Sequence, residues 1–264
     1  MSDNRQCTVI MLAAQRTGVV NPLAQKHGVS HKCVVPIRGK PLIVHVMDVL
    51  AGLEPVKKVR ISVEPEIHAE LEALLAPYRE RELDFDFIAS DPNIVESVLK
   101  AAEGEVAPYI VTTADNVLLS PEQFMKVLDT LETHDAVMNL AAKTDVKGIH
   151  ENAQGRFYEF RDEGYANCNL YGIKGPHAFK AAEVFREGGQ FMNNPGRLVT
   201  AFGMANIILF RMKLLTLAGA EKRLSRQFGL KLALLVPEDG AQAVDVDNDR
   251  TYEVAEMVLE QRGK

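Results

Sequence analysis

Several features that would assign a function class at once are missing from this sequence. Its three cysteines, Cys7, Cys33 and Cys168, lie far apart and form no CxxC spacing, so neither a zinc knuckle nor a redox pair is indicated. A net charge of -6 argues against nucleic acid as a partner. The polar N-terminus has no apolar region typical of a signal peptide, and the sparse cysteines suit a reducing compartment, so we expect a cytoplasmic protein.

Long apolar runs, internal repeats and low-complexity linkers are missing as well. The longest uncharged apolar stretch, residues 198–210, is too short to span a bilayer and is followed by Arg211 and Lys213. The chain has 264 residues, of which 47% are hydrophobic and 25% charged, an ordinary composition for a folded globular protein. We therefore expect a single domain over residues 1–264.

In the first half of the chain, short apolar runs typical of buried strands alternate with segments of helical periodicity. We expect strands at 8–14, 56–63, 83–89, 109–114 and 135–142, and helices at 41–53, 65–78, 93–103 and 120–131. Short connections between them predict βαβ units, hence an α/β, Rossmann-like fold with a mostly parallel sheet flanked by helices. Ligands of such sheets bind at the carboxyl ends of the strands.

The pattern changes after residue 143. The stretches GRFYEFRD and YANCNLYGIKG are typical of antiparallel strands, which we interpret as a small antiparallel insertion. A helix is expected at 175–187, mostly helical structure at 197–230, strands at 230–237 and 241–246, and a terminal helix from Asp249.

The loop after the first strand, residues 15–33, is long and basic and contains glycine. Its cations and glycines are Arg16, Gly18, Lys26, Gly28 and Lys32. Such a loop can surround a triphosphate with backbone N–H groups and positive charge, or it can be a solvated surface loop, and the residues alone leave both readings open. Neither the Walker spacing nor GxGxxG is present.

Two acidic stretches follow expected strands. Asp115 comes directly after the strand at 109–114, where it could hold Mg²⁺ or cap a turn. Asp245, Asp247 and Asp249 are spaced by two, so a cation or a helix N-terminus must offset their repulsion. Helix capping by Asp247 or Asn248 is the simpler alternative.

Taken in order, these stretches resemble a known family. TVIMLAAQRTG with KCVVPIRGKPL, then NIVESV, VTTADN and DVDNDRTYEVAE, are similar to the motifs of nucleotidyltransferases with the nucleotide-diphospho-sugar transferase fold. That family includes molybdopterin guanylyltransferase, cytidylyltransferases and sugar-phosphate nucleotidyltransferases. The resemblance runs from about Thr8 to the terminal helix.

The resemblance implies a Mg²⁺-dependent enzyme that transfers a nucleoside monophosphate from an NTP, CTP or GTP by preference, to a phosphorylated acceptor and releases pyrophosphate. It implies catalytic roles for Arg16 at the β- and γ-phosphates, Lys32 at the α-phosphoryl group and Asp115 at the metal. It also implies Asp247 or Asp245 as the second metal ligand. The nucleotide-binding residues it implies are Leu12, Ala13, Ala14, Gln15, Thr17, Gly18, Asn93 and Ser97.

We expect residues 8–142 to form the NTP-binding half, 143–240 an acceptor-binding insertion with helices, and 241–264 a return strand and terminal helix. In YANCNLYGI, Asn167 and Asn169 share a strand face that could bind acceptor hydroxyls, with Gly172 leaving room for close approach, although edge-strand polarity explains them equally. The sequence departs from the family at Gln15, where glycine is usual, and at VDNDRTY, where VDTPEDL is usual.

Two alternatives stay open: a glycosyltransferase that consumes an NDP-sugar, and a nucleotide-binding regulator without catalysis. The expected partners are an NTP and a small phosphorylated acceptor, and a homodimer is left open.

One local feature, the charge of residues 197–231, suggests a further partner. Residues 197–231 carry seven cations against the single acid Glu221, a balance of +6 that leaves -12 for the remainder. A helical pair with solvated cations explains this, and weak contact with an anionic membrane is the sharper hypothesis. The cations are Arg197, Arg211, Lys213, Lys222, Arg223, Arg226 and Lys231.

Overall fold

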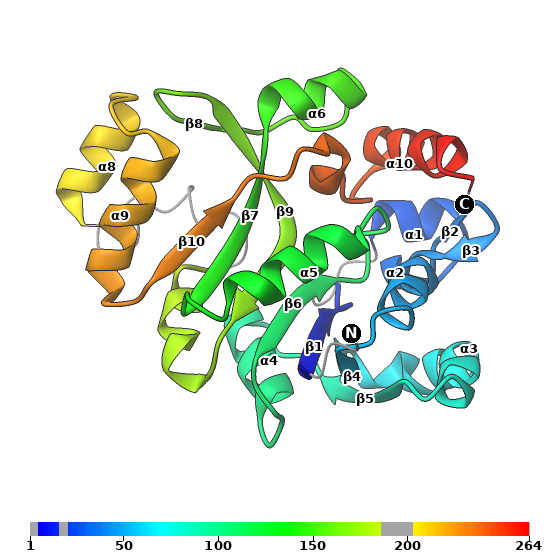
Figure 1. Cartoon of the computed structure of the whole chain (residues 1–264). Coiled ribbons are helices and arrows are strands. Elements are labelled where there is room, and N and C mark those ends of the chain that lie inside the picture. The colour runs from blue at the N-terminus through cyan, green and yellow to red at the C-terminus, as the bar shows by residue number, and fades with distance from the viewer. Residues whose placement is uncertain (1–4, 16–20, 186–202, 264) are drawn as a thin grey trace.

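The computed structural model describes residues 5–15, 21–185 and 203–263 (Figure 1). The strands of this part are β1 (Cys7–Leu12), β2 (Pro36–Ile37), β3 (Lys40–Pro41), β4 (Val56–Val63), β5 (Asp84–Ala89), β6 (Tyr109–Thr113), β7 (Ala136–Ala142), β8 (Tyr158–Glu159), β9 (Gly164–Ile173) and β10 (Leu232–Leu235). Its α-helices are α1 (Pro22–Lys26), α2 (Leu42–Leu50), α3 (His68–Glu80), α4 (Ile94–Ala102), α5 (Pro121–Thr130), α6 (Lys143–Ile149), α8 (Met204–Arg211), α9 (Leu217–Phe228) and α10 (Asp249–Gln261). Its 3-10 turns are η1 (Lys32–Val34), η2 (Pro65–Ile67), η3 (Pro176–Phe185) and η5 (Gly240–Ala243).

Within the described residues, eight strands form one mixed sheet in the order β10-β7-β9-β6-β1-β4-β5, and β8 pairs with β9. The pairs β6–β1, β1–β4, β4–β5 and β10–β7 are parallel. The neighbours β1 and β6 therefore end at the same edge of the sheet, and so do the loops that follow them. This confirms the predicted α/β fold and the edge at which a site was expected.

The core is built from alternate faces of the central strands. On β1, Val9 and Met11 are fully buried in a cluster that includes apolar residues of α2, α3 and α5. Ile10 packs in a second cluster with α4 and η3. Because successive strand side chains point to opposite faces, an almost wholly apolar strand such as β1 requires cover on both sides. The sheet thus forms the middle layer of a three-layer fold.

Side chains at the helix starts explain where the expected helices begin. Asn93 caps α4 and Ser120 caps α5, with Pro121 in the first helical position. At α10, Asn248 and Thr251 form a reciprocal capping box. Asn248 therefore accounts for the start of the terminal helix without help from the neighbouring acids.

The antiparallel strands expected after residue 143 are present, but they belong to the main sheet. β9 lies between β6 and β7 and pairs with both in the antiparallel sense. At Gly172 an added Cβ would lie 2.7 Å from Val127 and 2.9 Å from Leu131, side chains of α5 and of the residue that ends it. The close approach at Gly172 is therefore to a helix and not to a ligand.

Several elements differ from the sequence prediction. Pro41 is the N-cap of α2 and not its first turn, because it still pairs with Pro36 in the β2–β3 hairpin. Residues 176–185 wind as a 3-10 helix, with Ala178 N–H donating to Gly175 O at 2.9 Å. Helix α6 and the hairpin at Arg38–Gly39 were not predicted.

The strand expected at 241–246 was wrong, and with it the return strand assigned to 241–264. Residues Gly240–Ala243 form η5, whose first turn is capped by Asp239 through a 2.9 Å bond from Ala241 N–H. A Cβ on Gly240 would lie 2.3 Å from the Asp145 carbonyl carbon, so this backbone is pressed against α6. It packs on a helix in place of pairing with a strand edge.

Among the described residues, every helix is too short or too polar to cross a membrane.

Candidate functional site

The candidate site lies where the loops after β1 and β6 meet the segment before α10. Lys32 opens η1 in the first loop, Asp115 follows β6 by two residues, and Asp247 lies two residues before α10. A backbone bond of 3.2 Å from Val246 N–H to Asp115 O joins the two acidic segments. Three stretches far apart in sequence thereby reach one point at the carboxyl edge.

Lys32 is the cation that links the two aspartates. Its Nζ donates to Asp115 Oδ2 and, at 2.7 Å, to Asp247 Oδ1. The Asp115 side chain is 8% exposed, Lys32 20% and Asp247 62%, so the cluster runs from a buried floor to solvent. The structure thus brings three of the sequence-predicted charged residues into direct contact.

The charges of this cluster shift each other's pKa values. Burial alone would lower the pKa of Lys32, but the carboxylates of Asp115 and Asp247 outweigh it and raise that pKa. Burial opposes ionisation of Asp115, yet the Lys32 ammonium beside it lowers the pKa of this carboxyl below its usual value. The pair is therefore ionised at neutral pH.

Asp245 lies near this pair, but its pKa is shifted in the opposite direction from that of Asp115. It is 8% exposed, and its Oδ1 is buried without a hydrogen-bond partner. Burial, and then the nearby charges of Asp115 and Asp247, raise the pKa of Asp245 well above its usual value. Of the two candidates for a second metal ligand, only Asp247 shares Lys32 with Asp115.

The two asparagines predicted to bind an acceptor lie on β9 beside the acidic cluster. Asn167 Nδ2 donates to Asn169 Oδ1 and to Tyr171 Oη, both at 2.6 Å. A hydrogen bond from Asn169 also bears on Asp245, where it lowers the carboxyl pKa. Asn167 Oδ1 is buried without a partner. The asparagines thus adjoin the acids and leave one acceptor atom unused.

The residues expected to bind nucleotide do not all lie at the site edge. Leu12 ends β1 at the site edge, where Ala114 N–H donates to Leu12 O at 3.0 Å, and Ala13 and Ala14 directly follow the strand. The N–H of Gln15 donates to Glu64 Oε1 at 2.8 Å, so a carboxylate already occupies this amide. Arg16, Thr17 and Gly18 lie outside the described residues.

Asn93 and Ser97 have local structural roles. Asn93 caps α4 by accepting from Val95 N–H at 2.9 Å. The Ser97 hydroxyl accepts from Asp91 N–H at 2.8 Å and contacts Asp91 O at 3.2 Å. These bonds hold the loop after β5 in place, and none of them reaches Lys32 or Asp115.

The donors at the cluster suit a hard divalent cation. Asp115 and Asp245 each hold one buried carboxylate oxygen without a partner, and oxygen donors are what Mg²⁺ binds. Within residues 5–15, 21–185 and 203–263, however, no group of three or more His, Cys, Asp or Glu side chains is arranged to hold a metal ion. Lys32 stands between two of the carboxylates that would do so.

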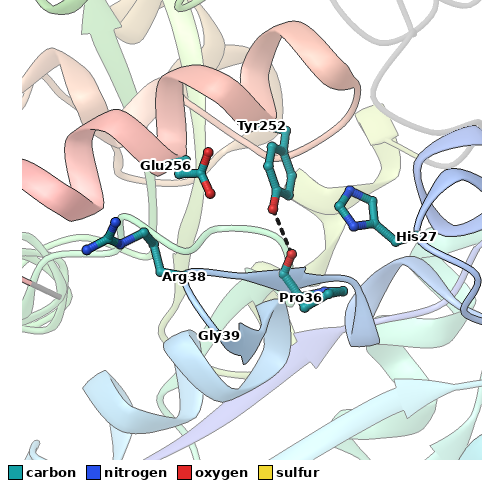
Figure 2. Close-up of a pocket in the computed structure, with 6 residues that line it drawn as sticks. All are labelled: His27, Pro36, Arg38, Gly39, Tyr252 and Glu256. Carbon is teal, nitrogen blue, oxygen red and sulfur yellow. Dashed lines mark hydrogen bonds between the residues drawn. The ribbon is translucent and has the colours of Figure 1, made fainter.

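A separate hollow of about 480 Å³ lies between the β2–β3 hairpin and α10 (Figure 2). The Tyr252 hydroxyl donates to Pro36 O at 2.8 Å across its floor, and the His27 and Tyr252 rings lie 5.1 Å apart. None of the sequence-predicted site residues lines it, so we place the chemistry at the Lys32 cluster. The lining residues are His27, Pro36, Arg38, Gly39, Tyr252 and Glu256.

Sequence reasoning missed two residues of this region. Glu64 directly follows β4, and Asn116 directly follows Asp115. Asn116 is 1% exposed and donates from Nδ2 to Thr112 Oγ1 at 3.2 Å. The rule that singled out Asp115, a polar residue just after a parallel strand, applies equally to Glu64.

Comparisons with known proteins agree with this geometry. The family of MobA-like NTP transferase domains matches residues 23–159, just over half of the chain. A comparison with curated protein sequences found no match.

Solved structures share the fold over nearly the whole chain. A hypothetical transferase from Thermus thermophilus is 21% identical with a TM-score of 0.72, covering 94% of this chain and 99% of its own. 4-Diphosphocytidyl-2C-methyl-D-erythritol synthase from Anaerococcus prevotii is 10% identical with a TM-score of 0.61, covering 98% and 100%. CMP:2-keto-3-deoxy-manno-octonic acid synthetase, solved with CTP, is 10% identical with a TM-score of 0.58, covering 97% and 99%. At these identities the likeness concerns the fold, and the matched family supplies the assignment: the chain belongs to the MobA-like NTP transferases and is a nucleotidyltransferase.

Proposed function

We propose that this nucleotidyltransferase depends on Mg²⁺ and transfers a nucleoside monophosphate from an NTP to a phosphorylated small molecule. The observation that carries the proposal is the contact of Lys32 with both Asp115 and Asp247 at the carboxyl edge of the sheet. Such a cluster joins a cation for the α-phosphoryl group with carboxylates for a divalent metal. The choice of CTP or GTP stays a prediction.

In the reaction, a phosphate oxygen of the acceptor attacks the α-phosphorus of the NTP. A new bond forms between that oxygen and the α-phosphorus, the bond from the α-phosphorus to the bridging oxygen breaks, and pyrophosphate leaves with the electron pair. Little covalent chemistry is required of the protein, so positioning and charge neutralisation dominate catalysis. A bound Mg²⁺ would supply neutralisation of the phosphate charge and alignment of the leaving group.

Asp115 and Asp247 would hold the metal, because carboxylate oxygens are the donors that Mg²⁺ binds. In the structure Lys32 donates to both carboxylates and balances their charge. Lys32 would leave them when the nucleotide and its metal bind, and its ammonium would then stabilise the α-phosphoryl charge. The Lys32 ammonium would thus pair with the aspartates before the nucleotide binds and with the α-phosphoryl group afterwards.

The acceptor side is proposed to include Asn167 and Asn169. Their amides, together with the Tyr171 hydroxyl, give a neutral polar surface next to the aspartates. Hydroxyl groups suit such a surface, which favours a sugar or polyol phosphate over an apolar acceptor. We likewise propose that residues 8–142 bind the NTP and 143–240 the acceptor within one domain.

The Gln15 departure from the family pattern bears on phosphate binding. Glu64 accepts the Gln15 N–H, so this carboxylate must give way before the amide can bind a phosphate oxygen. Glu64→Gln removes the negative charge and should tighten NTP binding. A regulator without catalysis would show the same gain in binding and no turnover.

Product analysis tests the function. The purified chain is incubated with Mg²⁺, each of CTP, GTP, UTP and ATP, and sugar or polyol phosphates, and pyrophosphate is measured. We expect pyrophosphate release that needs both NTP and acceptor. NDP release from an NDP-sugar would support the glycosyltransferase instead, and tight NTP binding without turnover would support the regulator. A thermal-shift screen of the four NTPs identifies the base, because stabilisation follows affinity.

We further propose that α8 makes weak contact with an anionic lipid surface. Met204, Ile208 and Met212 recur every four residues and are all at least half exposed, and Arg211 and Lys213 beside them are exposed cations. Figure 1 shows α8 at the outer edge of the molecule, beyond α9. The charge complementarity is local, because the chain as a whole is acidic. Each cation contributes about 1 kcal/mol near such a surface.

Vesicle sedimentation at low salt tests this contact. More protein should sediment with phosphatidylserine vesicles than with phosphatidylcholine vesicles, and Ile208→Glu should abolish the difference. Val106→Glu is the matched control, because Val106 is also exposed but lies before β6. Equal sedimentation with both lipids would overturn the proposal. A dimer that Ile208→Glu dissociates would instead show that a second copy covers this face.

A further inference from the structure

Two acidic segments must be held together for the proposed site to work. Asp115 lies on the loop 114–120, and Asp247 lies on the segment between η5 and α10. Only one described backbone bond joins the two segments at the acids themselves, from Val246 N–H to Asp115 O at 3.2 Å. A side chain elsewhere in these segments therefore matters for their relative position.

Gln242 in η5 is such a side chain. Its Nε2 donates to Leu118 O at 2.8 Å, and its Oε1 accepts from Ser120 N–H at 3.1 Å. Both ends of one amide therefore bind the loop that carries Asp115, at positions three and five residues beyond that aspartate. Gln242 itself is three residues before Asp245 and five before Asp247.

We call the Gln242 side chain, with its bonds to Leu118 and Ser120, the clamp. Two neighbouring residues, Asp239 and Arg262, support it. Asp239 Oδ2 accepts from Gln242 Nε2 at 3.2 Å and from Arg262 at 2.5 Å, and Arg262 also donates to Leu118 O at 3.3 Å. Gly240, pressed against the backbone of α6 at Asp145, prevents η5 from shifting. Gln242 is 2% exposed, so water does not compete for its bonds.

We infer that Gln242 is a positioning residue that sets the spacing between Asp115 and Asp247 and so the affinity of the site for a divalent cation. The inference rests on the proposed metal site. Gln242 touches neither aspartate and acts through the loop and the segment that carry them. Groups that orient metal ligands in this way typically change metal affinity or activity by about 10–100-fold when they are removed.

The chain offers a matched control in Gln123. This glutamine is 7% exposed and also donates from Nε2 to a buried partner, Asn139 Oδ1, but this side-chain bond joins α5 to β7 and does not involve the loop that carries Asp115. Leucine at either position keeps the volume and removes the amide. Both variants should lose stability to a similar degree, while only Gln242→Leu should change metal binding.

The experiment titrates Mn²⁺ into the full chain and follows free Mn²⁺ by electron paramagnetic resonance, alongside the Mg²⁺ concentration that gives half-maximal turnover. We expect Gln242→Leu to raise the Mn²⁺ Kd and the half-saturating Mg²⁺ by about tenfold or more, with Gln123→Leu near wild type. Equal values for the two variants would overturn the inference.

Two further variants keep the test decisive. If Gln242→Leu does not fold, Arg262→Ala removes the outer support of the clamp from a partly exposed position and should shift the Mn²⁺ Kd in the same direction. Asp115→Asn separates the two proposals. If it leaves Mn²⁺ binding unchanged, the proposed metal site is wrong, whereas if it weakens binding and Gln242→Leu does not, only the clamp is wrong.

Discussion

Two clusters of opposite charges lie on the same sheet and differ in their balance. In the first, the β4–β5 cluster, Lys58 and Arg60 of β4 contact Asp84 and Asp86 of β5 and Glu105, which precedes β6. It has two cations for three carboxylates. At the carboxyl edge, one cation among the described residues, Lys32, lies near the three carboxylates of Asp115, Asp245 and Asp247.

The two clusters also differ in whether their buried carboxylate oxygens have hydrogen-bond partners. In the described residues, no carboxylate oxygen of the β4–β5 cluster is buried without a partner, whereas one oxygen of Asp115 and one of Asp245 are. A hydrogen bond from Lys58 lowers the pKa of Asp86, while burial and neighbouring carboxylates raise the pKa of Asp245. Among the residues described, the second cluster therefore keeps two buried carboxylate oxygens without a partner, and the first keeps none.

The largest effect is expected at Asp115. Asp115→Asn keeps the size of the side chain but removes the charge that contacts Lys32 and that we propose holds the metal. Turnover with Mg²⁺ should fall by on the order of 10³-fold, since metal neutralisation of phosphate contributes several kcal/mol. Circular dichroism should show an intact fold. A variant that unfolds yet keeps its specific activity would assign Asp115 to turn capping.

Lys32→Ala should have the next largest effect on the reaction. Loss of a cation at the α-phosphoryl group should lower kcat by on the order of 10²-fold, with a much smaller change in NTP affinity. Steady-state kinetics with saturating NTP measure this. An unchanged kcat would remove Lys32 from the reaction, whatever its contacts in the nucleotide-free chain.

Substitution in the β4–β5 cluster should have the opposite effect: it should lower stability and leave catalysis unchanged. Arg60 donates to Glu105 at 2.8 Å and to Ala101 O at 3.1 Å, with both charged side chains 14% exposed. Arg60→Ala should therefore reduce the free energy of unfolding by about 1–3 kcal/mol and leave kcat unchanged. Urea titration and turnover assays check the two halves of this expectation. A large loss of kcat in a folded variant would erase the distinction between the clusters.

The smallest effect concerns a thiol beside the site. Burial, followed by the charge of Glu64, raises the pKa of the Cys33 thiol to about 12. Below that pH the thiol stays protonated and unreactive, so a thiol reagent at pH 8 should modify Cys33 slowly in the native chain and quickly in denaturant. Mass spectrometry of the labelled peptides identifies the residue. Rapid native labelling would show that this edge of the site is open.

The sequence was sufficient for those parts of the fold that depend on local pattern. Apolar runs predicted β1 and β6, and Ser120 with Pro121 predicted the start of α5. The 3-10 turn η5 escaped prediction because AQAVDV has a strand-like composition, while Asp239 and the backbone of α6 decide its shape. Contacts between distant segments overrode local preference there.

The same limit applies to the site. A strand-end position marked Asp115, and a motif resemblance marked Lys32 and Asp247, but no pattern showed that Lys32 would bridge the two acids. Gln242 gave no signal at all, because its role depends on a loop 122 residues earlier in the chain. The roles of Arg16, Thr17 and Gly18 stay predictions outside the described residues.

The central claim is that Lys32 holds the carboxylates that a divalent cation later takes. Mn²⁺ titration of the nucleotide-free chain, wild type against Lys32→Ala, tests it most directly. Mn²⁺ must displace the ammonium from the carboxylates in the wild type, and losing even one charged hydrogen bond costs about 1.5–3 kcal/mol, so Lys32→Ala should bind Mn²⁺ at least about tenfold more tightly although it turns over poorly. An equal or weaker affinity in Lys32→Ala would contradict the account.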